Sequence, residues 1–111
     1  MRQTKEVKVI VAALEEHKAE NIEVIDVKER TPFADYYILA TAPNARALSA
    51  YPDALTEALE KAKIDVRQIE GNPESEWVVV DAGEVVVQLF TAAKREEMNL
   101  DALLAAKKKQ D

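Results

Sequence analysis

The sequence predicts a mixed α/β domain in which helices pack on one β-sheet of about five strands. Its clearest signal is the stretch 77–90, WVVVDAGEVVVQLF, where two valine-rich runs flank a short polar break that contains Gly83. Apolar residues recur at helical spacing near the N-terminus and again in the middle of the chain. A glycine between β-branched runs is typical of a hairpin. Together these signals favour the order αββαβββα in a single domain that spans residues 1–111.

The first helix is expected over residues 5–18, with Thr4 before it as a cap. Four apolar side chains follow the i, i+3, i+4, i+7 spacing of one helix face, namely Val7, Ile10, Val11 and Leu14. His17, the one histidine, lies near the end of this segment and has no cysteine or carboxylate at metal-ligand spacing. We interpret His17 as a surface residue at the helix end, and Asn21 as the helix breaker.

Two strands are expected next, over residues 22–27 and 33–41. Both are rich in β-branched or aromatic side chains. The polar link between them, about six residues long, is too short for a helical crossover, so the strands should pair antiparallel. Because neighbouring side chains of a strand point to opposite faces, Tyr36 and Tyr37 should differ, with one in the core and the other nearer the surface.

The second helix should begin after Asn44, whose side chain can cap it. One apolar stripe contains Leu48, Tyr51, Leu55, Leu59 and Ala62. Pro52 falls inside this stripe, and an internal proline removes one hydrogen bond and clashes with the preceding turn. Two interpretations follow: a single helix kinked at residues 48–51, or two helices with Pro52 in the first turn of the second. The stripe stays in phase, which favours the kinked single helix.

The second half of the chain adds three strands and a last helix. We expect a third strand over residues 64–69 and a long turn-rich loop over residues 70–76. The hairpin of residues 77–90 then follows, and its two runs have no polar face, which predicts interior strands covered on both sides. A last helix should begin after Thr91, with Leu100, Leu103 and Leu104 on one face and Lys107–Lys109 at its end.

Composition and charge exclude several classes of function. The formal net charge is −6, whereas nucleic-acid binding through phosphates requires a basic stripe. The chain has no cysteine, which excludes disulfides and thiolate metal sites. No N-terminal apolar segment and no run of about 20 apolar residues is present, so we expect a soluble cytoplasmic protein without a membrane contact.

The hairpin carries an acidic rim. Between Arg67 and Lys94 the sequence contains five carboxylates and no Lys or Arg, and the carboxylates are Glu70, Glu74, Glu76, Asp81 and Glu84. Trp77, the one tryptophan, lies at the entrance to the hairpin. It either caps the sheet core or forms the centre of an interface, because Trp is among the residues that most often carry binding energy. The acidic rim favours the interface, with a basic protein as the partner.

An enzymatic role has less support. Asp26, Asp35, Asp81 and Glu84 lie on or beside strands, where carboxylates can hold magnesium. Nucleotidyl transfer also requires a glycine-rich turn that leads into a helix, and neither Gly71 nor Gly83 opens one. A magnesium-dependent nucleotidyltransferase that uses Asp26 and Asp35 is therefore the alternative hypothesis, and no cofactor is expected under the main one.

Three segments resemble the Iojap family, the ribosomal silencing factors. They are residues 24–27 (VIDV), residues 34–41 (ADYYILAT), and Glu70-Gly71 followed by residues 77–87 (WVVVDAGEVVV). The resemblance covers roughly residues 5–104 and leaves 105–111 as a lysine-rich tail. It implies a fold related to nucleotidyltransferases without their catalytic site.

The resemblance also implies a partner and a set of contact residues. Family members bind ribosomal protein fourteen of the large subunit, block association of the subunits and repress translation. Carried over by position, the partner-binding residues are Asp35, Tyr36, Arg46, Glu70, Gly71, Trp77, Asp81, Gly83 and Glu84. A homodimer built on an exposed strand edge or on the second helix is a further alternative.

Overall fold

The computed structural model describes residues 5–32 and 34–98. The order of its elements is α1 (Lys5–Glu16), β1 (Glu20–Asp26), β2 (Tyr36–Ala42), α2 (Ala45–Lys61), β3 (Gln68–Asn72), the short 3-10 helix η1 (Pro73–Ser75), β4 (Trp77–Asp81), β5 (Val85–Thr91) and α3 (Ala92–Met98). This order confirms the predicted mixed α/β fold. The expected cap Thr4 and the expected helical positions Leu100, Leu103, Leu104 and Lys107–Lys109 lie outside the described residues.

The five strands form one mixed sheet in the order β1-β2-β5-β4-β3. β1 pairs antiparallel with β2, as predicted, and β4 and β5 form the predicted antiparallel hairpin. β2 and β5 pair in parallel at the centre of the sheet, although α2, β3 and β4 lie between them in the sequence. The hairpin strands are therefore interior strands, and β1 and β3 are the two edges.

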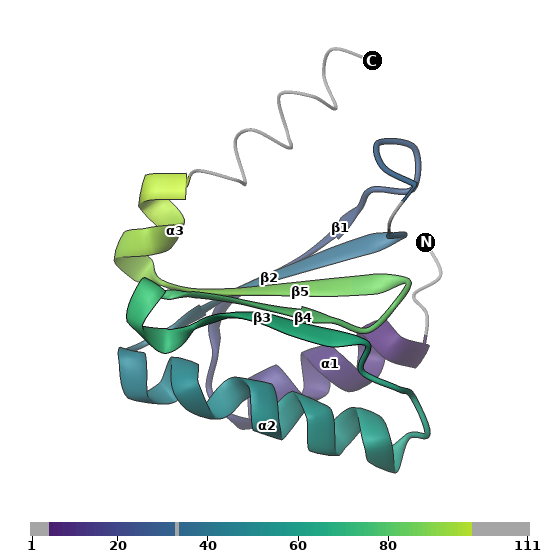
Figure 1. Cartoon of the computed structure of the whole chain (residues 1–111), viewed down its shortest axis with the longest axis horizontal. Coiled ribbons are helices and arrows are strands. Elements are labelled where there is room, and N and C mark those ends of the chain that lie inside the picture. Colours follow the sequence, from purple (N-terminus) through teal and green to yellow (C-terminus); the bar gives the residue numbers. More distant parts are fainter. Residues whose placement is uncertain (1–4, 33, 99–111) are drawn as a thin grey trace.

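Helices α1 and α2 cover one face of the sheet (Figure 1). The core between them and the sheet consists of alternate residues from the strands, such as Ile38, Val80 and Val87, packed on the apolar stripes of the two helices. α1 contributes Val7, Ile10, Ala13 and Leu14, and α2 contributes Leu48, Tyr51, Leu55 and Leu59. We call this face of the sheet the helix face, and the opposite one the distal face.

α2 is one continuous helix that includes Pro52. Its N-cap is Asn44, whose side chain accepts a hydrogen bond from the Ala47 N–H at 2.8 Å, as the sequence predicts. The alternative with two separate helices is excluded. Burial of the apolar stripe on both sides of Pro52 compensates for the hydrogen bond that the proline cannot donate.

The predicted position of the third strand and the predicted helix break at Asn21 are both wrong. The third strand was expected over residues 64–69, yet β3 is Gln68–Asn72 and so occupies part of the segment expected to be a loop. Pairing of Glu70, Gly71 and Asn72 with β4 provides backbone hydrogen bonds that outweigh their turn propensity. Asn21 does not end the helix, because α1 ends at Glu16 and Asn21 lies at a register shift inside β1.

The prediction that both hairpin strands are covered on both faces is confirmed for β5 and wrong for β4. All residues of β5 except Val86 are buried. In β4 only Val78 and Val80, which point to the helix face, are buried, whereas the three alternate residues on the distal face are half-buried. β4 therefore has one buried face and one partly exposed face, although its sequence is a run of valines. The partly exposed face carries Trp77.

α3 packs on the sheet at the end of β5 and is held there by Arg95. The guanidinium of Arg95 donates hydrogen bonds to the Thr41 hydroxyl at 3.0 Å and to the backbone carbonyl of Asn21. It also lies 3.6 Å from a carboxylate oxygen of Glu23, and the Arg95 side chain is only 10% exposed. One side chain thus connects the last helix to β1 and β2, on the side of the sheet opposite α1 and α2 (Figure 1).

Candidate functional site

Strand register places the distal-face side chains in rows across the sheet. One row contains Asn72, Trp77, Phe90 and Thr41, and the next contains Glu70, Val79, Gln88, Leu39 and Glu23. A third contains Gln68, Asp81, Val86, Tyr37 and Ile25. Apolar side chains are thus mixed with polar or acidic ones, and β3 contributes only polar side chains to these rows. Phe90, Thr41, Leu39 and Gln88 are buried, so in the first two rows the accessible side chains near Trp77 are those of β3 and β4. Apolar side chains with a polar margin are typical of a surface that can contact another protein.

Trp77 lies at one end of β4, on the distal face. Its ring stacks on Phe90, with the centroids 6.2 Å apart and the planes 9° from parallel. Its Nε1 donates a hydrogen bond to the Gln88 side chain at 3.3 Å, and the residue as a whole is half-buried. The indole is therefore fixed in orientation while part of its surface stays accessible, as expected of an aromatic anchor in an interface.

The β4–β5 turn, at the other end of β4, is fixed by backbone contacts. One carboxylate oxygen of Asp81 accepts a hydrogen bond from the Gly83 N–H at 2.8 Å, and Gly83 has the left-handed φ of +88° that this turn requires. The Glu84 carbonyl accepts hydrogen bonds from the N–H groups of Asp35 and Tyr36. Asp35, Asp81, Gly83 and Glu84 therefore form one cluster, with the Glu84 side chain exposed.

The structure corrects the expectation that the acidic rim has no basic neighbour. A β-carbon built at Gly83 would lie 3.4 Å from Nε of Arg67, so the guanidinium rests against the turn. The Arg67 N–H also donates a hydrogen bond to the Asp81 carbonyl at 2.7 Å. Part of the acidic charge at this end of the hairpin is therefore offset by a residue that is distant in sequence.

The predicted site residues divide into separate groups. Trp77 and the Asp81–Glu84 turn lie at opposite ends of β4, and Glu70 lies on β3 between them, where it pairs with Val79. Gly71 also belongs to β3 and has a φ of +83°. A β-carbon there would overlap the Trp77 carbonyl oxygen, so Gly71 is required for close contact between β3 and β4.

Two predicted contact residues lie away from the distal face. Tyr36 is 1% exposed and belongs to the core on the helix face, where Nζ of Lys28 lies 3.2 Å from its hydroxyl. Tyr37 is the half-buried member of the pair, which confirms that the two tyrosines differ. Arg46 is exposed in the first turn of α2, on the helix side of the sheet. The prediction of a partner contact through the Tyr36 side chain is therefore not retained.

The residues of the alternative enzymatic hypothesis do not form a metal centre. Asp26 accepts a hydrogen bond from the Lys28 N–H at 3.0 Å, and Asp35 lies in the turn cluster described above. Within residues 5–32 and 34–98, no three His, Cys, Asp or Glu side chains are grouped so as to hold a metal ion. In the same part of the chain, none of the helices has the length and apolar character to cross a membrane.

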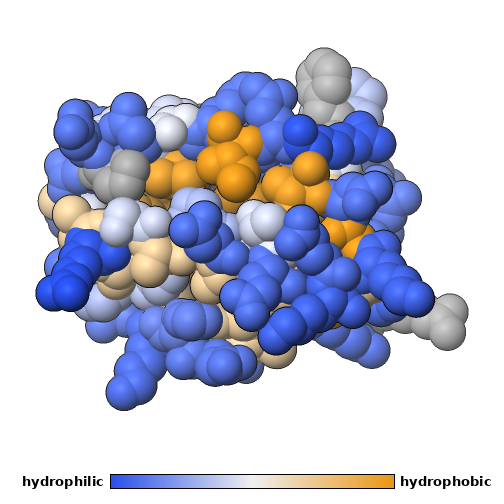
Figure 2. Space-filling view, turned by 60° about the horizontal axis from the view of Figure 1, so that its bottom comes forward, coloured by the Kyte–Doolittle hydropathy of each residue, from blue (hydrophilic) through white to orange (hydrophobic). Residues whose placement is uncertain are grey.

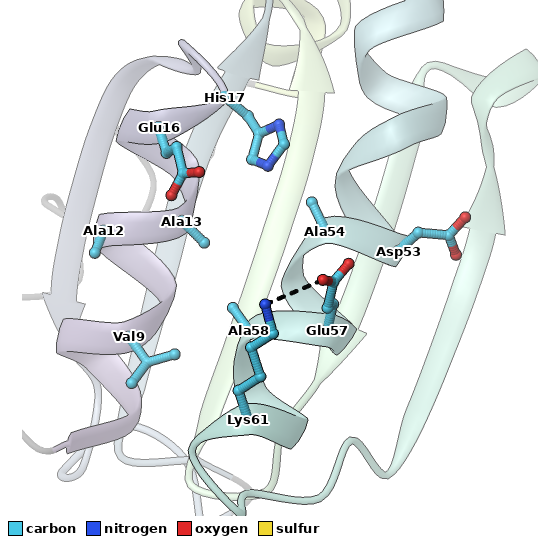
Figure 3. Close-up of a pocket in the computed structure, with 10 residues that line it drawn as sticks. All are labelled: Val9, Ala12, Ala13, Glu16, His17, Asp53, Ala54, Glu57, Ala58 and Lys61. Carbon is cyan, nitrogen blue, oxygen red and sulfur yellow. Dashed lines mark ion pairs between the residues drawn. The ribbon is translucent and has the colours of Figure 1, made fainter.

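A groove of about 690 Å³ runs between α1 and α2, away from the distal face (Figure 3). Small side chains form its floor, including Ala13, Ala54 and Ala58, and charged side chains form its rim. On that rim Lys61 pairs with Glu57 at 3.2 Å, and His17 is exposed just after the end of α1, as predicted. The groove contains none of the residues predicted to contact a partner.

Comparison with known proteins identifies the family. A family model described as "Ribosomal silencing factor during starvation" matches residues 1–111. The chain is 33% identical over 101 residues to the Ribosomal silencing factor RsfS of Chromobacterium violaceum, which covers 91% of this chain and 83% of that protein. It is 30% identical over 103 residues to the protein of the same name from Bacillus subtilis, with 93% and 87% covered.

A mouse protein and two solved structures extend the comparison. The mouse protein is named "Mitochondrial assembly of ribosomal large subunit protein 1" and is 27% identical over 101 residues, which are 88% of this chain and 44% of that protein. A crystal structure of a Chromobacterium violaceum protein superposes with a TM-score of 0.86 at 32% identity, covering 93% of this chain and 86% of the other.

The second structure, from Bacillus halodurans, gives a TM-score of 0.77 at 25% identity, with 87% and 90% covered. The family is regulatory and non-enzymatic, so the nucleotidyltransferase alternative is not retained. The family model matches the full sequence, the fold matches over 93% of the chain, and the residues that carried the resemblance lie on or beside β1, β2 and the strands β3 to β5. The chain belongs to the ribosomal silencing factor family.

Proposed function

We propose that this chain binds ribosomal protein fourteen of the large subunit through the distal face, and that its bulk then blocks association of the small subunit and represses translation. The observation that carries the proposal is the position of Trp77 and Val79. Both are half-buried on the distal face of β4, beside the exposed carboxylate of Glu70 on β3. An apolar centre with an acidic margin fits a basic protein, and no cofactor is needed for steric blocking.

The charges that would face the partner can be tested without damage to the turn. Replacing Asp81 by Lys would remove the oxygen that accepts the Gly83 N–H, so loss of binding in that variant would not separate charge from fold. Glu70 and Glu84 are exposed and can be reversed instead. Asp81→Asn keeps a side-chain oxygen as acceptor while it removes the charge.

The direct experiment is co-sedimentation of the purified chain with large ribosomal subunits in sucrose gradients. We expect binding that weakens as salt is raised, because exposed charges are screened. Glu70→Lys with Glu84→Lys should weaken binding by roughly tenfold or more. The matched control is Glu15→Lys with Asp53→Lys, which makes the same charge change at exposed positions of α1 and α2.

The experiment tests the binding and the docking surface separately. Absence of the wild-type chain from the large-subunit fractions would refute the proposal as a whole. Equal affinity of the two double variants would refute the distal face as the docking surface, provided that their circular dichroism matches that of the wild type. The same gradients also measure subunit association. Excess chain should lower the fraction of subunits that sediment as joined ribosomes.

A further inference from the structure

β3 is an edge strand with a free hydrogen-bonding side. It occupies the end of the sheet order, and all five of its residues are exposed. β4 pairs with one side of β3, and among the described strands none pairs with the other. The N–H and C=O groups on such a side can accept an additional strand from another chain.

An apolar surface lies directly beside this edge. Ile69 pairs with Val80 and so points to the helix face, where it is 44% exposed, the one large hydrophobic residue exposed in the described part of the chain. A groove of about 600 Å³ separates it from α2, lined also by Thr56, Glu60 and Val66. Figure 2 shows that hydrophobic side chains reach the surface on this side of the molecule and are bounded by hydrophilic ones.

The geometry suits an extended segment rather than a helix. Alternate side chains of an added strand would point to opposite faces of the sheet. Those on the helix side would meet Ile69 and Val66, and those on the other side would continue the distal face beyond Glu70. The edge is therefore continuous with the surface proposed for docking.

The charges beside β3 indicate which kind of segment can pair with it. Four carboxylates lie along the edge and its groove, on Glu60, Asp65, Glu70 and Glu74, and the one guanidinium there, Arg67, rests against Gly83. Two copies of β3 paired with each other would bring like charges together, which is unfavourable across strands. A segment rich in lysine or arginine is the complementary occupant.

We infer that β3 takes up an extended, basic segment of the ribosomal protein partner as a sixth strand of the sheet. This inference rests on the proposed function and adds the mode of contact: backbone hydrogen bonds along β3, with Ile69 as the apolar contact. It differs from docking by the distal face alone, because Ile69 lies on the helix side of the sheet.

Hydrogen exchange of the full chain, alone and bound to purified large ribosomal subunits, tests the inference. We expect the amides of residues 68–72 to exchange at least about tenfold more slowly in the complex. Amides of β1, the opposite edge, serve as the internal control and should keep their rates. A complex that co-sediments while residues 68–72 exchange as in the free chain would overturn the strand addition and leave the proposed function intact. Failure to co-sediment would overturn both.

A variant pair provides an independent readout. Ile69→Lys places a positive charge against the basic segment and should weaken binding to large subunits by about tenfold, whereas Ile69→Val should bind within about twofold of the wild type. Because Ile69 is exposed, both variants should fold, and circular dichroism checks this. Wild-type affinity of Ile69→Lys would contradict the inference, since docking by the distal face alone leaves this side chain out of the contact.

Discussion

The ring of Trp77 stacks on that of Phe90, with the two planes 9° from parallel and the centroids 6.2 Å apart. Phe90 is fully buried and Trp77 is half-buried, so the pair joins the sheet interior to the distal surface. The two residues are cross-strand partners in the hairpin. The two interpretations of Trp77, as a cap of the core and as an interface anchor, therefore describe two sides of one ring.

Substitution of Trp77 should separate these roles. We expect Trp77→Ala to lower the free energy of unfolding by about 2 kcal/mol, because it removes the contact with Phe90 and part of the buried area. Trp77→Phe keeps a stacked ring and should cost less than about 1 kcal/mol. Urea unfolding followed by circular dichroism measures both, since neither variant retains a tryptophan. Equal losses in the two variants would contradict a role for stacking.

The two glycines should respond unequally to alanine. At Gly71 a β-carbon would overlap the Trp77 carbonyl oxygen, which belongs to the backbone and cannot move aside. We expect Gly71→Ala to cost about 3 kcal/mol, from this overlap together with the positive φ. At Gly83 the nearest atom belongs to the flexible Arg67 side chain, so Gly83→Ala should cost about 1 kcal/mol. Thermal unfolding of the two variants tests the order, which the reverse ranking would refute.

Loss of Arg95 should release α3 from the sheet. Within the described residues Ala92–Met98 of α3, the Arg95 side chain makes the hydrogen bonds that bind this helix to β1 and β2. We expect Arg95→Ala to cost about 2 kcal/mol, because its partly buried, charged hydrogen bonds to Thr41 and Asn21 disappear. Amides of α3 should then exchange faster with solvent while those of β5 do not. A uniform change across the chain would indicate a global loss of stability instead.

Tyr51 should make the stability of the chain sensitive to alkaline pH. Burial, and secondarily the negative charge of Glu20, raises the pKa of its phenol above the ordinary value, and its hydroxyl donates a hydrogen bond to the His17 carbonyl at 3.3 Å. The unfolded chain therefore loses this proton first, and stability falls as pH rises above about 10.

The control for Tyr51 is the phenylalanine variant. Tyr51→Phe lacks the ionisable group and should lose less stability than the wild type between about pH 9 and pH 11. At neutral pH the same change should cost about 1 kcal/mol through the lost hydrogen bond. Stability is measured against pH for both proteins, and the difference between the two curves isolates Tyr51 from the groups that the two proteins share. Parallel curves between about pH 9 and pH 11 would contradict the prediction.

Local signals determined much of the fold. The apolar stripe of α1, the Asn44 cap and the valine runs around Gly83 each depend on residues close together in sequence, and each was predicted. β3 was misplaced because its sequence, QIEGN, has little strand propensity. Its conformation comes from pairing with β4, and the β-branched residues before it instead pack at the margin of the core.

The residue types of the candidate site could be predicted from the sequence, whereas their arrangement in space could be predicted only in part. Trp77 and the acidic residues could be selected by type and position. The contact of Arg67 with the turn depends on tertiary structure, whereas the hydrogen bond from the Gly83 N–H to Asp81 is local and joins residues two apart in sequence. Ile69 carried no sequence signal as a surface residue, since an apolar residue at a predicted strand is ordinarily buried. Only the edge position of β3 leaves it exposed.

The parallel pairing of β2 with β5 has a consequence for the chain during its own synthesis. Tyr36 pairs with Val85, so this central contact closes a loop that contains α2, β3 and β4. Such long-range closure carries an entropic cost and cannot occur until β5 has emerged from the exit tunnel. The surface that carries Trp77 is therefore absent from every shorter nascent chain. A nascent chain that stops before Val85 thus lacks the surface proposed for docking.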